Sequence, residues 1–356
     1  MKLSFSQSAN NLLNFLAKRN LLTEIEDDSL RSENSNNIQE YDIDNTSAIH
    51  AGKAIEISGF TQIRSQMVNN QVRMRDMNIN HANLNVKGRI SSILGYRIQT
   101  ELAASPQLLE AYAEVRLKDY FNLSVGQQKV PFSLENLTES NHLSLIDRSQ
   151  VVKALTYRSM NVTNYQNGHD VGIQVKGSLK RKNRILVDYR IGVFNGLGIK
   201  ALDSYQDKDV VARLVFHPIA GLAVGGDYYN GIGKIGNTEQ TVNRERSRWG
   251  LELNYEKKRI SLRSEYIKGK DADVIHDGYY VQAGYYILLQ KLQAILKYDT
   301  YNDDLSLNDD SSSWYIIGLT YNFNSTSRIQ AGYTFIDQQG PGLKNNFLAV
   351  QFQIGF

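Results

Sequence analysis

The feature that most constrains the fold of this chain is an alternation of apolar and polar residues with a period of two. It recurs along most of the sequence. In the last segment, 346–356, apolar residues occupy every second position: Leu348, Val350, Phe352, Ile354 and Phe356. Such alternation is the pattern of a strand with one apolar face. The segments run for roughly 9–13 residues, which is the length that a tilted strand needs to cross a bilayer.

About 16 such segments follow one another, and an even number fits a single-chain bacterial barrel. The pattern predicts an all-β fold, a transmembrane antiparallel β-barrel with a short helical N-terminal segment. The expected strands are 54–67, 78–90, 93–104, 108–117, 121–129, 168–179, 183–195, 208–217, 221–231, 246–257, 259–270, 276–288, 291–301, 312–323, 326–337 and 346–356.

The connections between these segments alternate in length, which supports the barrel independently. Very short turns are expected near 91–92, 118–120, 180–182, 218–220, 258, 289–290 and 324–325. Longer loops are expected at 68–77, 130–167, 196–207, 232–245, 271–275, 302–311 and 338–345, with a short exception at 105–107. Short turns on one rim and long loops on the other are the arrangement of outer-membrane barrels.

Composition agrees with an exported barrel. The 356 residues have a mean hydropathy of -0.41. No run approaches the 18 or so consecutive apolar residues of a membrane-spanning helix. A barrel that alternates lipid-facing and lumen-facing residues keeps a low average hydropathy. Cysteine is absent, and the formal net charge of +3 predicts no nucleic-acid partner.

Residues 1–53 differ from the rest and are expected to form a separate helical and flexible periplasmic segment, ahead of a barrel over 54–356. Apolar residues recur at helical spacing between residues 11 and 30, and Thr23 with Glu26 makes a capping box. Residues 31–53 are polar. No signal peptide is evident, because the first 20 residues lack a clean apolar run and a small-residue cleavage site.

The stretch VGQQKVPFSLENLTESNHLSLIDRS (125–149) resembles the porin O/P family, the phosphate-selective porins and their Bacteroidetes-type relatives. The family pattern of Gly, then Lys-x-Pro-Phe, then Glu is matched by Gly126, Lys129, Pro131, Phe132 and Glu135. Further matches are the acidic-Arg-Ser step at 147–149, GVFNGLG (192–198) and DKDVVARLVFHP (207–218). The family's Gly-Arg-Asp-x-Gly step is present at 168–172 with His169 in place of the arginine. The helical stretch 12–33 is also similar to the preface of many relatives.

The resemblance implies a 16-stranded barrel, usually a homotrimer in the bacterial outer membrane, whose third long loop folds into the lumen. Residues 130–167 occupy the position of that loop. A loop of this length is well beyond the usual range and is often functional.

The predicted lumen phase carries both bases and acids, so two interpretations stay open. Rings of Arg and Lys attract anions, and guanidinium groups bind phosphate oxygens in bidentate fashion. The same phase carries Glu and Asp at comparable frequency, and cross-strand pairing would make those bases ordinary wall structure. The bases are Arg64, Lys87, Arg89, Arg97, Arg116, Lys176, Arg190, Arg213, Arg263 and Lys297, and the acids are Glu56, Glu101, Glu114, Asp170, Asp188, Asp209, Glu252, Glu265 and Asp299.

The site residues predicted from this pattern fall in two groups. The expected pore constriction, on or beside loop 130–167, comprises Arg148, Arg158, Lys153 and Lys129. Arg148 ranks first because it lies where the loop should cross the pore. The expected pore-lining residues on the strands are Arg64, Arg97, Arg116, Arg190 and Arg213.

The sequence thus predicts a porin that passes small hydrophilic solutes by passive diffusion, with anions expected and phosphate as one candidate. The expected partners are outer-membrane lipid, small anionic solutes and two further copies of the chain. Neither an enzyme, a cofactor nor a metal is expected, since no catalytic or metal-ligand motif is found. The alternatives are a general non-selective pore and a non-conducting scaffold barrel of the cell envelope.

Overall fold

The computed structural model describes residues 49–50, 55–68, 74–103, 105–156, 168–196, 198–199, 208–235, 242–307, 310–338 and 346–356. The predicted N-terminal helices lie outside these residues. The strands are β1 (Ile49–His50), β2 (Ile55–Val68), β3 (Met74–Arg89), β4 (Leu94–Glu101), β5 (Gln107–Lys118), β6 (Phe121–Lys129), β7 (His169–Arg181), β8 (Arg184–Phe194), β9 (Asp209–Phe216), β10 (Leu222–Ile235), β11 (Val242–Lys257), β12 (Ile260–Asp271), β13 (Val274–Leu288), β14 (Leu292–Asn302), β15 (Ser311–Asn322), β16 (Arg328–Gln338) and β17 (Phe347–Gly355).

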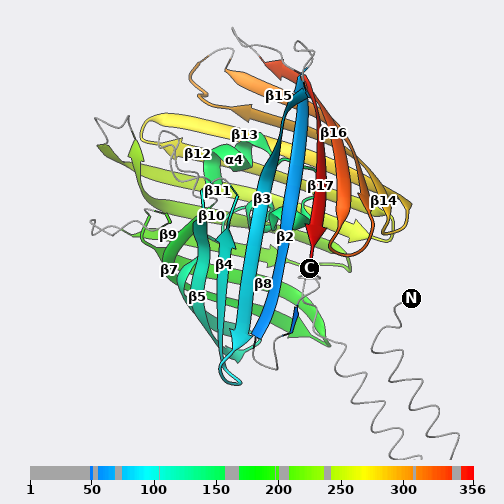
Figure 1. The fold of residues 1–356 in the computed structure, drawn as a ribbon. Helices are drawn as coiled ribbons and strands as arrows, with labels where there is room; N and C mark the ends of the chain where they lie inside the picture. Colours follow the sequence, from blue (N-terminus) through cyan, green and yellow to red (C-terminus); the bar gives the residue numbers. More distant parts are fainter. Residues whose placement is uncertain are drawn as a thin grey trace, which may run out of the picture. The chain divides into compact units, whose positions relative to one another are not determined.

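Strands β2–β17 form a closed antiparallel barrel in which each strand pairs with its neighbour in sequence (Figure 1). The ring closes where β17 pairs with β2, with Gln351 opposite Arg64. The two-residue strand β1 pairs with the start of β2, beside the barrel closure. The predicted 16-strand barrel is therefore confirmed. Closure leaves no unpaired edge in the ring of the described strands β2–β17, which a membrane demands because its core offers backbone groups no water.

The barrel is apolar on its outer face and polar inside, as the alternation predicts. On β15, Ile317 and Leu319 are 55% and 49% exposed, whereas Thr320 is 3% exposed. The largest fully buried side chains include Gln62, Gln330 and Gln351. In water this arrangement would be unfavourable, but a lipid-facing barrel requires it. Among the described residues, no helix is long and apolar enough to cross a membrane.

The short turns of one rim are those predicted, and several contain non-glycine residues with positive φ. Lys258 has φ 54° between β11 and β12, and Gln290 has φ 61° between β13 and β14. Tight hairpins use this backbone conformation because it matches the twist of the strands. One expectation is wrong. The connection predicted as a longer loop at 271–275 is a two-residue turn around Ala272, with φ 55°, because β12 and β13 extend farther than their apolar alternation.

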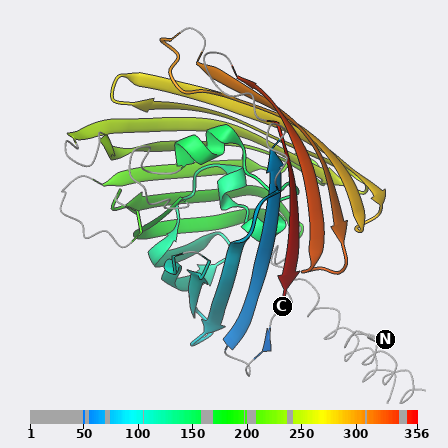
Figure 2. The same cartoon turned by 45° about the horizontal axis from the view of Figure 1, so that its top comes forward.

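Residues 130–156, named here the lumen loop, contain α3 (Leu134–Leu137), the 3-10 turn η1 (Ser140–His142) and α4 (Gln150–Thr156). Figure 2 shows these helices inside the ring of strands. The loop and the wall share an apolar cluster, which joins Val130, Phe132, Val151, Val152 and Leu155 to Phe194, Val211, Tyr229, Ile267 and Tyr280. Inward glycines allow close approach. A Cβ on Gly318 would lie 2.4 Å from Leu145 Cδ2.

Candidate functional site

Two wall carboxylates hold the start of α3 in the lumen loop by accepting hydrogen bonds from its backbone. Asp227 Oδ2 accepts from the N–H of Ser133 at 2.9 Å. Glu265 accepts from the N–H groups of Leu134 and Glu135, both at 2.8 Å. These hydrogen bonds satisfy backbone donors at the first turn of α3, which have no partner within the helix. They fix the start of α3 against β10 and β12, on the inner side of the barrel.

The start of α4 is held in the same way on the next part of the wall. Asp299 on β14 accepts from the backbone N–H of Gln150 at 3.0 and 3.2 Å. The Gln150 amide donates to the carbonyls of Asp299 and Ser312, each at 3.2 Å. The carboxylate therefore satisfies a backbone donor at the first turn of a helix, where donors otherwise lack partners.

A buried ion pair joins the centre of the loop to β14. Glu135 Oε1 lies 3.0 Å from Lys297 Nζ, and the two side chains are 3% and 0% exposed. Glu135 Oε2 also accepts from the N–H of Ser149 at 2.7 Å. Burial alone would raise the pKa of Glu135, but the Lys297 ammonium and the Ser149 donor outweigh it, so the pKa lies below its ordinary value. The glutamate stays ionised and ties α3 to both α4 and the wall.

The loop is held on its other side by arginines of β2 and β4. Arg64 forms a bidentate pair with Asp147, at 3.0 and 2.9 Å, and Lys153 Nζ lies 3.2 Å from the same carboxylate. Burial would raise the pKa of Asp147, but Lys153 and Arg64 outweigh it and hold that pKa well below its usual range.

Arg97 pairs with Glu139 of the loop, and its Nε lies 3.1 Å from Glu110 of β5. Burial would raise the pKa of Glu139, but Arg97 and Lys129 outweigh it and lower that pKa. Both predicted wall arginines, Arg64 and Arg97, therefore serve to dock the loop. Neither has its guanidinium free of carboxylates.

The predicted constriction residues on the loop fold the loop itself. Arg148 donates to the carbonyls of Thr138 at 2.7 Å and Glu135 at 3.2 Å. Lys129 Nζ donates to the carbonyls of Leu137 and Thr138 at 3.2 and 3.4 Å. Lys153 reaches Asp147 and lies 5.9 Å from the centre of the Trp314 ring. Arg158 lies outside the described residues.

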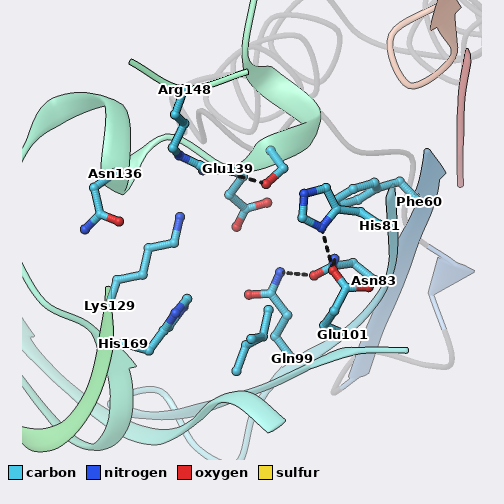
Figure 3. Close-up of a pocket in the computed structure, with 12 residues that line it drawn as sticks. Phe60, His81, Asn83, Gln99, Glu101, Lys129, Asn136, Glu139, Arg148 and His169 are labelled. Carbon is cyan, nitrogen blue, oxygen red and sulfur yellow. Dashed lines mark hydrogen bonds and ion pairs between the residues drawn. The ribbon is translucent and has the colours of Figure 1, made fainter. Parts of the chain in front are cut away.

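Lys129 and Arg148 also line a small polar cavity between the lumen loop and the wall (Figure 3). Its volume is about 40 Å³. At roughly 10–15 Å³ per water, this is room for about three waters. His169, which replaces the arginine of the family pattern, lines it and is 2% exposed. Its Nε2 lies 3.5 Å from Glu110, and neither ring nitrogen has a hydrogen-bond partner among the described residues.

The remaining predicted lining residues lie on the wall toward the short-turn rim. Arg116 Nε lies 2.7 Å from Glu114 and its side chain is half exposed. Arg213 Nε donates to Glu252 at 2.9 Å. For Arg190, by contrast, the described part of the chain shows neither an ion pair nor a hydrogen bond. Its neighbour Ile191 is 51% exposed on the outer face, so Arg190 belongs to the inner phase of β8.

Arg190 is the centre of a row of cations that crosses three strands. The register places Lys176 of β7 opposite Arg190, and Arg190 opposite Arg213 of β9. We call these three residues the cationic row. Like charges directly opposite each other destabilise a sheet. Lys176 is compensated by Glu114 at 2.6 Å and Arg213 by Glu252. The row lies on the short-turn side of Phe194, the β8 residue that packs against the lumen loop.

Several arginines in the lumen were not predicted as site residues. Arg328 donates to Gln353 at 3.2 Å and to the carbonyl of Ser140 at 3.4 Å, so its partners among the described residues are neutral. Arg246 and Arg248 are each 2% exposed and share Asp271. The strand alternation could have identified them as lumen-facing, because these residues occupy the same phase as Glu252 and Gln330 on their strands. Within the described ranges, no group of three or more His, Asp or Glu could hold a metal ion.

Comparison with known proteins gives one family and one fold. Residues 57–353 match the family of phosphate-selective porins O and P. The anion-selective porin from Comamonas acidovorans has a similar structure, with a TM-score of 0.64 at 13% identity over 85% of this chain and 99% of that one. OmpF of Salmonella typhi gives 0.64 at 15% identity over 87% and 100%.

The trimer form of OmpT, an outer membrane protein of Vibrio cholerae, gives 0.63 at 13% identity over 85% and 99%. At these identities the likeness concerns the fold. The comparison with curated proteins found no match.

Proposed function

This chain belongs to the family of phosphate-selective porins O and P, and on that premise we propose that the solutes crossing its lumen are small hydrophilic anions, phosphate among them. The chain is an outer-membrane porin and provides a path for passive diffusion. Its specificity therefore rests on which charges the lumen presents to a passing solute.

The observation that carries the proposal is an imbalance between acids and bases in the lumen. The wall acids Asp227, Glu265 and Asp299 are 7% exposed or less and accept hydrogen bonds from the lumen loop. They present little negative charge to the channel. Three lumen guanidinium groups that are only partly buried have no carboxylate partner in the part of the chain that the structure describes: Arg148, Arg190 and Arg263. The uncompensated charge is positive.

The cationic row is the step at which this charge acts. An anion that passes the lumen loop meets three cations side by side on β7–β9, and only two of them have carboxylate partners. A positive row in a low-dielectric wall raises the local anion concentration. Because Lys176 and Arg213 are already engaged by Glu114 and Glu252, binding stays weak enough for the solute to leave.

We assign the predicted residues different parts in this function. Lys129, Arg148 and Lys153 shape the constriction by holding the loop, and Arg158 is proposed to contribute a charge there. Arg64 and Arg97 position the loop through Asp147 and Glu139. Arg190 and Arg213, with Arg116 nearer the rim, line the path.

The test is the reversal potential of the purified porin in a planar bilayer under a KCl gradient. Arg190→Gln should lower the anion-to-cation permeability ratio by several-fold, because it removes the cation without a partner. The matched control Lys270→Gln removes one exposed charge at the long-loop end of β12 and should leave the ratio unchanged. Equal ratios in all three proteins would remove Arg190 from the mechanism. If millimolar phosphate fails to reduce the chloride current, phosphate is excluded as a solute. A barrel that shows no conductance would favour the scaffold interpretation.

We further propose that the porin sits in a bacterial outer membrane as a homotrimer and performs no chemistry on its solute. Support for the trimer comes from the outer face. The exposed aromatics on the strands are Phe121, Phe216, Tyr228, Trp249, Tyr279, Tyr285, Tyr315, Tyr321, Phe335 and Phe352. Strands β2–β5 contribute none among their described side chains. Interfacial aromatics anchor lipid-facing strands, so this face, which is poor in exposed aromatics, suits contact between copies. A monomer in detergent sedimentation would contradict this.

A further inference from the structure

We propose that the short-turn rim of the barrel is a binding surface for the phosphate groups of anionic phospholipids in the inner leaflet. Most of its exposed cations lie in two arcs, one on the turns of β5–β8 and one on the turns of β11–β14, while Arg89 at the turn between β3 and β4 lies outside both. We call the cations of the two arcs together the basic rim. They are Lys118, Lys180, Arg181, Lys182, Arg184, Lys257, Lys258, Arg259 and Lys291.

The charge of this rim is strongly one-sided. In the two arcs, the acidic side chains are Asp119, which pairs with Lys180 at 3.0 Å, and Glu256. Arg184 and Arg259 donate to backbone carbonyls, at 2.7 Å and at 2.8 and 2.9 Å respectively. Within the described residues, the six others are exposed and have no partner: Lys118, Arg181, Lys182, Lys257, Lys258 and Lys291. The rim thus displays positive charge that nothing in the barrel uses.

Bulky apolar side chains in the turns of the same rim indicate that it lies at a membrane surface. Ile90, Tyr120, Ile219, Leu289 and Phe323 are 69%, 54%, 55%, 52% and 55% exposed. Turns in open water have no reason to carry such residues. Aromatic and aliphatic groups beside lysine are the signature of the lipid headgroup region, where the ammonium reaches phosphate while its stem stays apolar.

The geometry of β11 places one of these cations on the lipid side. Trp249, Leu251, Leu253, Tyr255 and Lys257 share the outer phase of the strand, so the lysine ends an apolar stretch. Lys258 follows in the tight turn. The distribution over two separated arcs fits many small ligands better than one docked macromolecule. Phospholipid phosphates are negatively charged and lie in the headgroup region, at the level of these cations.

The opposite end of β11 and β12 provides a matched control. Lys268 and Lys270 also lie at a strand end, but Lys268 faces Asp277 across the ladder, and Asp273 and Glu245 are exposed nearby. Their positive charge is balanced. Removing it should have little effect on anionic lipid.

The experiment measures the enrichment of phosphatidylglycerol over phosphatidylcholine in lipid co-isolated with the full chain from nanodiscs containing both. The wild type should enrich phosphatidylglycerol. In Lys257→Gln/Lys258→Gln this enrichment should fall about fivefold for each lysine removed, as expected for about 1 kcal/mol per cation. Lys268→Gln/Lys270→Gln should stay near wild type. Heat-dependent gel mobility verifies that all three barrels fold. Added salt should reduce the enrichment by screening.

Three outcomes would overturn the proposal. One is equal enrichment in the wild type and the Lys257/Lys258 variant. Another is displacement of the lipid by inorganic phosphate beyond that by chloride of equal ionic strength, which would make the rim a site for the free anion. The last is lysine-dependent cosedimentation with peptidoglycan sacculi without lipid enrichment. None of these depends on the charge preference of the lumen.

Discussion

The two halves of the lumen wall use the same residue types for opposite purposes. Strands β10–β14 carry Asp227, Glu265 and Asp299, whose charges are taken up by backbone donors of the lumen loop. Strands β7–β9 carry the cationic row, where Arg190 has no carboxylate partner among the described residues. The comparison teaches that a count of lumen charges does not define selectivity. Acids used for docking are removed from the path, while cations left beside it remain.

The largest effect should come from breaking the buried pair that joins the two parts of the loop to β14. Glu135→Ala leaves Lys297 buried without its partner, which costs about 3–5 kcal/mol for pairs of this kind. The loop should release from the wall and single-channel conductance should rise. The anion preference should persist, since the cationic row is untouched.

The control for this prediction replaces both partners. Glu135→Gln/Lys297→Met removes the unpaired charge, so the double variant should hold the loop better than Glu135→Ala does. Conductance that stays at the wild-type level in Glu135→Ala would show that the pair does not hold the loop. Loss of anion preference in an open channel would show that the loop, and not the row, selects the solute.

Acid should undock the loop on the β2 side. Asp147 has a pKa held well below its usual range in the folded protein, whereas an unperturbed Asp titrates near 3.9. A depressed folded pKa contributes stability that is fully present above the unfolded value and is lost as pH falls through the folded one. The contribution of Asp147 to loop docking should therefore be constant from neutral pH to about 4 and should be lost below it, where conductance should rise. Glu139, whose pKa is also lowered, acts in the same direction.

Asp147→Asn tests which carboxylate is responsible. It cannot ionise, so the Arg64 contact should already be weakened at neutral pH and the acid-induced rise should be smaller. An unchanged pH profile in this variant would assign the acid response to other groups. In either case the porin should keep its preference for anions when the lumen loop is released, because the cationic row contains no carboxylate of its own.

The strands could be predicted from the sequence, because each has one face toward lipid and one toward the lumen and so alternates apolar and polar residues. The sequence also identified the loop, from its length and from the family resemblance that Lys129, Pro131 and Phe132 carry. It did not separate Arg64 and Arg97, which hold the loop, from Arg190, which has no partner. Their phase is identical, and the difference arises from contacts across more than 40 residues, such as Arg97 with Glu139. The missed Arg246 and Arg248 share a phase with Glu252 but precede the part of the strand with clear apolar alternation.

The smallest effect should come from one methyl group at the contact between the loop and β15. Gly318→Ala places a Cβ 2.4 Å from Leu145 Cδ2, in the apolar contact of Leu145 with Ile295 and Ile316. The clash is with the end of a flexible side chain, so we expect a cost of about 1 kcal/mol, the low end for overpacking. Hydrogen exchange of loop amides should quicken about fivefold, since a cost of this size shifts a local opening equilibrium by that factor.

Gly332 lies directly opposite Gly318 in the ladder, and a Cβ there would have its nearest neighbour, Ile317 O, at 4.0 Å. Gly332→Ala is therefore a control with the same chemical change and no clash. If both variants exchange alike, the loop does not rest on β15 at this point. If only Gly318→Ala quickens exchange while the reversal potential stays constant, docking and selectivity belong to different walls of one barrel.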